Sequence, residues 1–250
     1  MYSAAGLDVV GLRKAFNGRV VLDSASFHAR CGEFVVILGS SGAGKTTLLR
    51  CIAGLTTPDA GAVSLNGVDL LQLHGRARRQ VGVVFQQFNL VRRLSALENV
   101  LAGRLGYVPA WRGWLRQFAR ADVLCALECL EQVGLLAQAE QRADTLSGGQ
   151  QQRVAIARIL AQRPALILAD EPVASLDPQT SMGIIELLRQ IGRQYGSVVV
   201  CNLHQAHLAQ TYADRIVGLA QGCLAVNVTA AEFDRATFTQ LYGALGRADA

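Results

Sequence analysis

The stretch that most constrains the fold is 34-FVVILGSSGAGKTT-47, where a run of five apolar residues leads directly into a glycine-rich turn. Gly39, Gly44, Lys45 and Thr46 fit the pattern G-x-x-x-x-G-K-[ST], and helical spacing begins within it. Glycine allows positive φ angles and lets the backbone approach a ligand closely. Backbone N–H groups and the start of the helix then favour an anion. The stretch therefore predicts a strand, a phosphate-binding loop and a helix.

This loop is expected to bind a polyphosphate together with Mg²⁺. Lys45 supplies a mobile positive charge for the β- and γ-phosphate oxygens, and the Thr46 hydroxyl can ligate the metal ion. An ordinary strand–turn–helix junction with a surface lysine is the alternative, and the motif alone leaves GTPases, kinases and many ATPases open. We expect the whole loop to line the site: Gly39, Ser40, Ser41, Gly42, Ala43, Gly44, Lys45, Thr46 and Thr47.

Two adjacent carboxylates end a second apolar strand, 164-PALILADEP-172. Ligand sites in parallel sheets lie at the carboxyl ends of the strands, so we expect this pair close to the loop. Asp170 would hold Mg²⁺, directly or through water, and Glu171 would orient and polarise the attacking water. A pair of solvated acids at a strand end is the alternative interpretation.

The segment 146-LSGGQ-150 begins another predicted helix. Ser147 and Gln150 have the spacing of a capping box. Gly148 and Gly149 occupy the first turn, where each glycine costs about 1 kcal/mol relative to alanine. A simple cap does not need both glycines, whereas a helix tip that approaches a phosphate closely does.

With LSGGQ followed by a strand that ends in Asp-Glu, the chain resembles the ATP-binding cassette (ABC) family over about residues 7–225. The resemblance implies further site residues. Gln86 in 85-FQQ-87 would sense Mg²⁺ and the attacking water, and His204 in 203-LHQ-205 would contact the γ-phosphate and Glu171. Asp177 in 175-SLD-177 would lie at a dimer seam, and Phe16 would stack on adenine.

The resemblance also implies an assembly. Two copies would pack head to tail, so that each ATP lies between the loop of one copy and Ser147, Gly148, Gly149 and Gln150 of the other. Segments such as 84-VFQQFNLVRRLSALENVLAGRLGYVPAWRGWLRQFAR-120 and 167-ILADEPVASLDP-178 are similar to the phosphonate importer ATPases, and the subunits for phosphite and hypophosphite are closely similar. The implied partners are two transmembrane permease subunits and, indirectly, a periplasmic substrate-binding protein, with no nucleic acid.

The order of predicted elements favours an α/β fold with a mostly parallel sheet, because strands alternate with helices on both sides of a helical stretch. The resemblance adds that the core is a P-loop NTPase, with an antiparallel β subdomain and an inserted α-helical subdomain. We expect the core at about 7–89 and 146–225, the helical subdomain at about 90–145 and a tail at about 226–250. The tail departs from the pattern of relatives, and two short strands and a terminal helix are expected from about residue 214 onward.

Net charge and hydropathy do not by themselves define where the protein is located or which class of partner it binds. The 250 residues carry a net charge of +5 and lack an apolar run of the ~18 residues that a membrane-spanning helix needs. The start of the chain does not have the pattern of a signal peptide. We expect a peripheral protein on the cytoplasmic face of a bacterial inner membrane. A soluble cassette that acts on DNA or ribosomes is the alternative, whereas a small-molecule kinase leaves LSGGQ unexplained.

Arginine and aromatic residues alternate in the stretch 104–120. Docking against the permease, or local packing, is the interpretation favoured by its place in the helical subdomain. Direct contact with lipid or nucleic acid is the alternative. The residues concerned are Arg104, Tyr107, Trp111, Arg112, Trp114, Arg116, Phe118 and Arg120.

Overall fold

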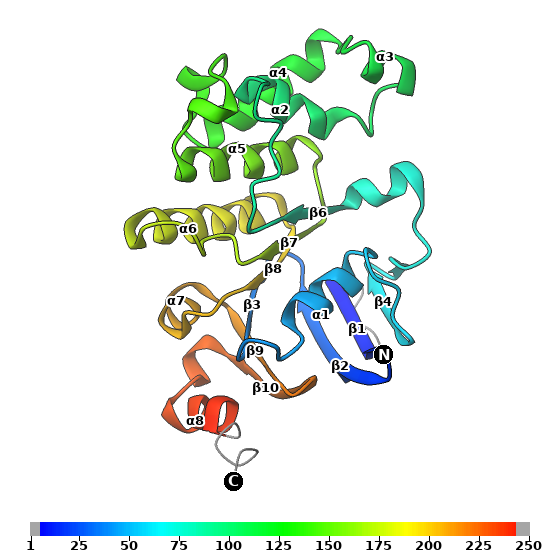
Figure 1. Cartoon of the computed structure of the whole chain (residues 1–250), viewed down its shortest axis with the longest axis vertical. Coiled ribbons are helices and arrows are strands. Elements are labelled where there is room, and N and C mark those ends of the chain that lie inside the picture. The colour runs from blue at the N-terminus through cyan, green and yellow to red at the C-terminus, as the bar shows by residue number, and fades with distance from the viewer. Residues whose placement is uncertain (1–5, 244–250) are drawn as a thin grey trace.

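The computed structural model describes residues 6–243, which form a central parallel sheet, a second antiparallel sheet and a group of helices at one end (Figure 1). The central sheet is parallel except for β10, which pairs antiparallel with β9. Its strands lie in the order β10 (Cys223–Thr229), β9 (Arg215–Ala220), β3 (Phe34–Leu38), β8 (Val198–Asn202), β7 (Leu166–Asp170) and β6 (Val81–Val84).

The central strands are nearly continuous apolar runs because both faces of the sheet are covered. Successive side chains of a strand point to opposite faces. In β3, Phe34, Val36 and Leu38 enter one hydrophobic cluster with the helices, while Val35 and Ile37 enter a second cluster with the antiparallel sheet. The parallel sheet is thus the middle layer of the molecule.

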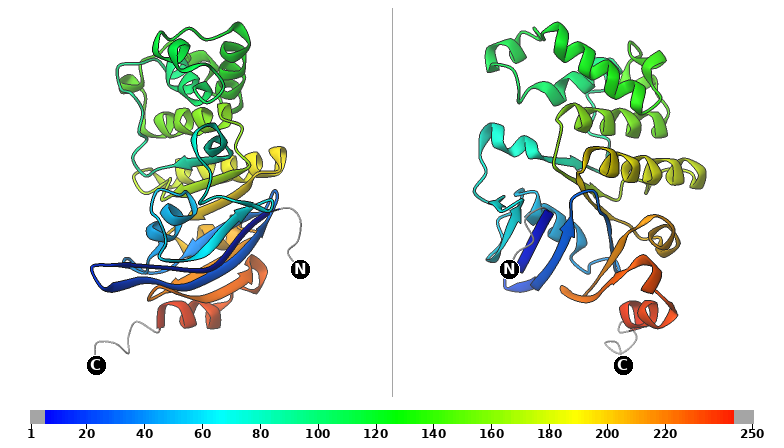
Figure 2. Two further views of the ribbon diagram at one scale, coloured as in Figure 1. Left: turned by 90° about the vertical axis from the view of Figure 1, so that its right-hand side faces the viewer. Right: turned by 180° about the vertical axis from the view of Figure 1, so that it is seen from behind.

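The second sheet has the order β2 (Arg19–Arg30), β1 (Gly6–Phe16), β4 (Ala60–Leu65) and β5 (Val68–Asp69). All its pairings are antiparallel. Its buried side chains and those of α1 (Lys45–Ile52) share the second cluster with the central sheet. β1 and β2 form a long hairpin, visible on the left of Figure 2.

The helical region between β6 and β7 lies at the top of Figure 1. It contains α2 (Ala96–Leu101), α3 (Ala110–Trp114), α4 (Arg120–Gln132) and α5 (Gly148–Ala161), and buried residues of α2, α4 and α5 join the cluster that covers the central sheet. Short 3₁₀ segments connect the elements of the fold: η1 (Gly75–Gln80), η2 (Ala102–Arg104), η3 (Leu136–Gln138), η4 (Ala143–Thr145) and η5 (Ala230–Glu232).

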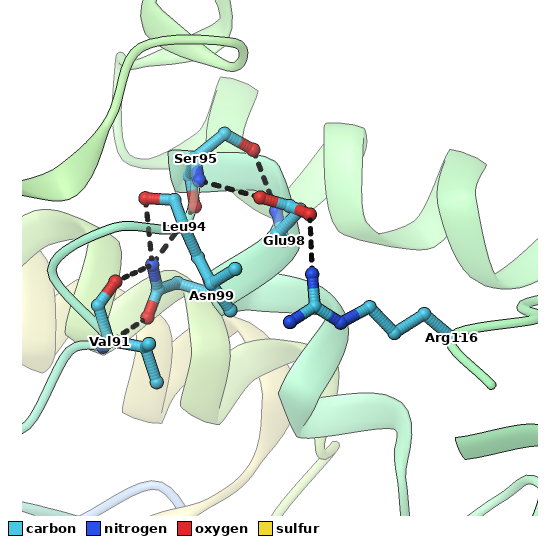
Figure 3. A network of polar contacts seen from close by, with 6 residues as sticks. All are labelled: Val91, Leu94, Ser95, Glu98, Asn99 and Arg116. Carbon is cyan, nitrogen blue, oxygen red and sulfur yellow. Dashed lines mark hydrogen bonds and ion pairs between the residues drawn. The ribbon is translucent and has the colours of Figure 1, made fainter. Parts of the chain in front are cut away.

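The buried side chain of Asn99 fixes the chain where it enters this helical region (Figure 3). Its Oδ1 accepts a hydrogen bond from the Val91 N–H at 2.8 Å, and its Nδ2 donates to the carbonyls of Val91, Leu94 and Ser95. Ser95 and Glu98 add a capping box at the start of α2. The loop after β6 is therefore tied to α2 by side-chain hydrogen bonds.

The remaining helices are α6 (Pro178–Tyr195), α7 (Ala206–Tyr212) and α8 (Arg235–Gly243). The two strands and terminal helix expected from about residue 214 onward are β9, β10 and α8, which confirms that prediction. Within the described residues 6–243, none of the helices combines the length and hydropathy that crossing a bilayer would require.

Candidate functional site

The predicted site residues follow neighbouring strands at one edge of the central sheet. Ile37 of β3 and Asp170 of β7 both lie opposite Asn202 of β8, and Val84 of β6 lies opposite Ala169. Because these strands are parallel, their carboxyl ends meet at this edge. The glycine loop, the Asp-Glu pair, the loop with His204 and the loop with Gln86 all emerge there.

Two glycines of the loop are required by its geometry. Gly39 has φ 153° and Gly44 has φ 104°. A Cβ at Gly39 would lie 2.2 Å from the Leu219 carbonyl oxygen, and one at Gly44 would lie 2.7 Å from that of Val21. The loop therefore packs directly on the backbone of β9 and β2, which fixes the position of the α1 N-terminus.

Lys45 is buried beneath this loop. Its Nζ donates hydrogen bonds to the carbonyl oxygens of Gly39 at 2.7 Å and Ser40 at 2.9 Å. Burial lowers the pKa of Lys45, while the nearby charges of Glu171 and Asp170 oppose that shift. The ammonium group is held by backbone carbonyls, so an anionic ligand in the loop could take over these contacts.

Asp170 and Thr46 form the predicted metal pair. The Thr46 Oγ1 donates a hydrogen bond to Asp170 Oδ1 at 3.2 Å. The same oxygen accepts a second hydrogen bond, from Asn202 Nδ2 at 2.8 Å. Asn202 is fully buried, and its Oδ1 has no hydrogen-bond partner among the described residues. The carboxylate is thus oriented from two sides.

Glu171 and His204 face each other across the site. His204 Nε2 lies 2.7 Å from Glu171 Oε1. Glu171 has φ 51°, a left-handed conformation that is uncommon for a residue other than glycine. Its N–H donates to the Asn202 carbonyl at 3.2 Å. Backbone strain of this kind concentrates at functional sites.

Lys45, Thr46, Glu171 and His204 line a cavity of about 260 Å³ at the start of α1. A larger cavity of about 580 Å³ adjoins it between β2, the glycine loop and the β9–β10 turn. The smaller one is bounded by Val21, Ser41, Gly42, Gly44, Lys45, Thr46, Thr47, Glu171 and His204. The structure therefore brings the loop, the predicted catalytic pair and the predicted metal pair together.

Other predicted residues do not reach this cavity. Gln86 is exposed and lines a separate cavity of about 480 Å³ with Gln87, Phe88 and Gln151. Phe16 ends β1 with 46% of its surface exposed, and the Lys14 ammonium lies 5.3 Å from the centre of its ring.

The LSGGQ segment forms a second helix tip, at the start of α5. Gln150 N–H donates to Ser147 Oγ at 3.3 Å, and Gln150 Oε1 accepts from the Ser147 N–H at 2.9 Å, which is the expected capping box. A Cβ at Gly149 would lie 2.6 Å from Thr180 Cγ2, whereas one at Gly148 would make only ordinary contacts. Gly149 thus has a packing reason within the chain, which the sequence interpretation missed.

Asp177 lies beside this second tip as the N-cap of α6. Its Oδ1 accepts a hydrogen bond from the Thr180 N–H at 2.9 Å. Hydrogen bonding to Thr180 lowers the pKa of its exposed carboxyl group. Since Thr180 also contacts Gly149, Asp177 and the α5 tip form one surface.

Two residues that support the site were not predicted. Asn202 orients Asp170, and the only sequence signal for it is a polar residue at the end of the apolar run 198-VVVCN-202. Gly222 donates its N–H to the Ala43 carbonyl and accepts from the Asp23 N–H, so the β9–β10 turn supports the loop. The sequence signal for this turn is the dipeptide Gln221-Gly222, just before the predicted tail.

Comparison with known proteins identifies the family. Residues 22–174 match the ABC transporter family model. The chain is 51% identical to the phosphonates import ATP-binding protein PhnC of Frankia casuarinae, covering 90% of each chain, and 46% identical to PhnC of Rhodopseudomonas palustris, covering 94% of this chain and 89% of that one. It is 45% identical to the hypophosphite import ATP-binding protein HtxD of Stutzerimonas stutzeri, covering 94% of this chain and 70% of that one.

A solved structure of an ATP-binding cassette has a similar fold. The cassette MJ0796, determined as a dimer in a post-hydrolysis state bound to ADP and Pi, has a TM-score of 0.76 and 34% identity, covering 90% of this chain and 98% of that one. This likeness confirms the predicted ABC ATPase fold. The chain belongs to the ABC transporter family.

Proposed function

We propose that this chain is the ATP-hydrolysing subunit of a phosphonate importer that works with a separate permease. Lys45, Thr46, Glu171 and His204 line one cavity at the start of α1, and Asp170 accepts a hydrogen bond from Thr46; this arrangement carries the proposal. The names of the relatives support the class of cargo. The fold supplies no argument for the cargo, because selection of the cargo is assigned to other subunits.

The loop residues would bind the triphosphate of ATP. The backbone N–H groups at the start of α1 have no side-chain cap and are free to donate to phosphate oxygens. Lys45 would exchange its carbonyl partners for the β- and γ-phosphates. The adjoining cavity beside β2 offers space for the rest of the nucleotide.

Mg²⁺ fits the oxygen donors of Thr46 and Asp170, which already lie within hydrogen-bond distance of each other. When bound, the ion would neutralise phosphate charge during hydrolysis. Asn202 holds the Asp170 carboxylate in one orientation from the neighbouring strand. We assign Gln86 to the same ion, which requires movement of the loop after β6.

Glu171 is the proposed general base. Its carboxylate would accept a proton from the attacking water, and His204 would steady that carboxylate and contact the γ-phosphate. Since Glu171 is kept in place by strand β7, the His204 contact and its own backbone hydrogen bond to Asn202, its position is set before the substrate binds.

The second half of the site would come from another copy of the chain. Ser147 and Asp177 are exposed and the rest of the α5 tip is half-buried, so this surface could meet the triphosphate of a partner. Phe16 would stack on the adenine ring. The dimeric MJ0796 cassette supports this arrangement by similarity. Release of the γ-phosphate would remove the charge that holds the two copies together.

The proposal places the chain at the cytoplasmic face of the membrane, bound to two permease subunits and served by a periplasmic binding protein. Growth of a bacterial strain that lacks this gene tests which compound the transporter imports. We expect loss of growth on methylphosphonate as the sole phosphorus source, normal growth on phosphate, and rescue by the natural chain but not by Glu171→Gln.

Two outcomes would change this assignment. The similar identity to HtxD makes hypophosphite the second candidate, and growth lost on hypophosphite but not on methylphosphonate would select it. Normal growth of the deletion strain on every phosphonate, phosphite and hypophosphite would contradict an import role. ATPase activity stimulated by DNA or ribosomes would then favour the non-transport class.

A further inference from the structure

The chain's only two tryptophans lie in α3, within a stretch that has no acidic residue from 99 to 121. The same stretch contains four arginines. None of the site residues proposed above belongs to it. The structure divides it into side chains that anchor it and side chains that face outward.

The anchoring side chains are Arg104 and Tyr107. Arg104 binds Asp122 at 2.9 Å and the Ala161 carbonyl at 3.0 Å. The Tyr107 hydroxyl donates to the Gln162 carbonyl at 3.0 Å, and the guanidinium of Arg104 lies 3.8 Å from the centre of its ring. These two residues pack locally, so they need no outside partner.

The outward side chains form one patch, which we define as Trp111, Arg112, Trp114, Leu115 and Arg116. Trp114 is 86% exposed and Trp111 is 57% exposed. Arg112 lies 5.2 Å from the centre of the Trp111 ring. The patch occupies the outer corner of the helical region, labelled α3 in Figure 1.

The conformation of this patch is fixed by its own contacts. Arg116 reaches back to Glu98 of α2 at 3.3 Å, as Figure 3 shows. The Gln117 N–H donates to the Arg112 carbonyl at 2.8 Å. A Cβ at Gly113 would lie 2.8 Å from Leu105 Cδ2, so α3 packs closely on that side chain. The tryptophans are therefore held outward by an ordered segment.

We propose that the patch at Trp111–Arg116 binds anionic phospholipid headgroups at the membrane surface. Tryptophan prefers the interface between headgroups and acyl chains, and Leu115 adds an aliphatic side chain suited to that depth. Arginine is attracted to an anionic surface. Arg116 is paired with Glu98, so the net positive charge of the patch comes from Arg112, which forms no ion pair among the described residues. Aliphatic side chains do not stack on bases, which favours lipid over nucleic acid.

This inference adds a lipid contact to the proposed work beside a permease, but the contact itself requires neither nucleotide nor permease. Both tryptophans report on it, because the chain has no others. We would titrate the full chain with vesicles of phosphatidylcholine containing 30% phosphatidylglycerol, and with phosphatidylcholine alone. We expect a saturable blue shift of tryptophan emission, and quenching by brominated acyl chains, with the anionic vesicles only.

Arg112→Glu should weaken binding to anionic vesicles by about tenfold or more, because it replaces an attracted charge with a repelled one. Arg235→Glu makes the same charge change on exposed α8, at the opposite end of the molecule in Figure 1, and should change binding less than about twofold. Trp111→Ala with Trp114→Ala should abolish vesicle sedimentation. Lipid-free ATPase activity should be the same in all variants.

Several results would overturn the proposal. One is an unshifted emission spectrum with anionic vesicles, and another is equal loss of binding in Arg112→Glu and Arg235→Glu. A shift that requires permease in the vesicle would assign the patch to protein docking, and a shift with single-stranded DNA alone would assign it to nucleic acid. Failure of nucleotide binding would count against the proposed ATPase, whereas the vesicle result would stand.

Discussion

The two glycine-rich helix tips of this chain differ in what surrounds them. The α1 tip begins at Gly44 without a side-chain cap, above a buried lysine and next to Asp170 and Glu171. The α5 tip is capped by its own Ser147 and Gln150 and lies on the surface. One tip has the proposed catalytic groups beside it in the same chain, and the other lies at the surface without them.

This difference supports separate roles for the two helix tips in the proposed dimer. An uncapped tip above a lysine can bind a phosphate within one chain. A self-capped tip keeps its first N–H groups available but provides no charged side chain of its own, so it can complete a site that another copy begins. We therefore attribute nucleotide binding to the α1 tip and dimer closure to the α5 tip.

The largest expected effect is on ATP hydrolysis, through Glu171, which belongs to neither helix tip. Glu171→Gln should lower ATP turnover by about 10²- to 10⁴-fold, because general-base catalysis contributes on that scale. Nucleotide affinity should remain, since Gln keeps the shape of the side chain. Release of phosphate and binding of a fluorescent ATP analogue measure the two quantities. Glu186→Gln, on the outer part of α6, is the matched control and should leave turnover unchanged. Equal turnover in both variants would remove Glu171 as the base.

Substitutions at the two tips should have different effects on the ATP affinity of the monomer. Lys45→Ala should reduce the ATP affinity of the monomer by about 10- to 100-fold, because hydrogen bonds from charged groups contribute about 1.5–3 kcal/mol. Ser147→Arg should leave that affinity within about twofold, as the α5 tip does not reach the cavity of its own chain. Isothermal titration at low protein concentration distinguishes them. Similar losses in the two variants would contradict the division between tips.

A smaller effect on turnover is expected from Asn202, which orients Asp170 beside the α1 tip. Asn202→Ala removes one of the two hydrogen bonds to Asp170 Oδ1, so turnover should fall by about tenfold. The Mg²⁺ concentration for half-maximal activity should rise, which a purely structural defect would not cause. Thermal unfolding provides the stability control. Unchanged Mg²⁺ dependence would make Asn202 a packing residue only.

The smallest effect concerns the cap of α5. Ser147→Ala should lower the free energy of unfolding by about 0.5–2 kcal/mol, because an N-cap hydrogen bond is lost. Ser95→Ala removes the equivalent cap of α2 and should cost a similar amount. Urea denaturation measures both. Dimerisation should weaken for Ser147→Ala alone, and the same weakening in Ser95→Ala would show that general stability is responsible.

Much of the fold and of the α1 tip could be predicted from the sequence because local chemistry determines them. The strand at 34–38 and the loop after it were predicted correctly, since the apolar run and the required glycines are adjacent. Asn202 and Gly222 could not be assigned, because their roles depend on strands that meet only in the folded sheet. The division of residues 104–120 into anchored and outward side chains likewise depends on the carbonyl groups of Ala161 and Gln162, which are distant in sequence.

The most direct measurement is the molar mass of Glu171→Gln by light scattering, with Mg²⁺ and saturating ATP. The account predicts a shift from one chain of 26.7 kDa to a stable pair, and its reversal when ATP is removed. The same variant carrying Ser147→Arg should bind ATP and remain a single chain, because only the α5 tip is blocked. A Glu171→Gln chain that stays monomeric with ATP bound, or pairs equally well with Ser147→Arg, would contradict a site shared between two copies.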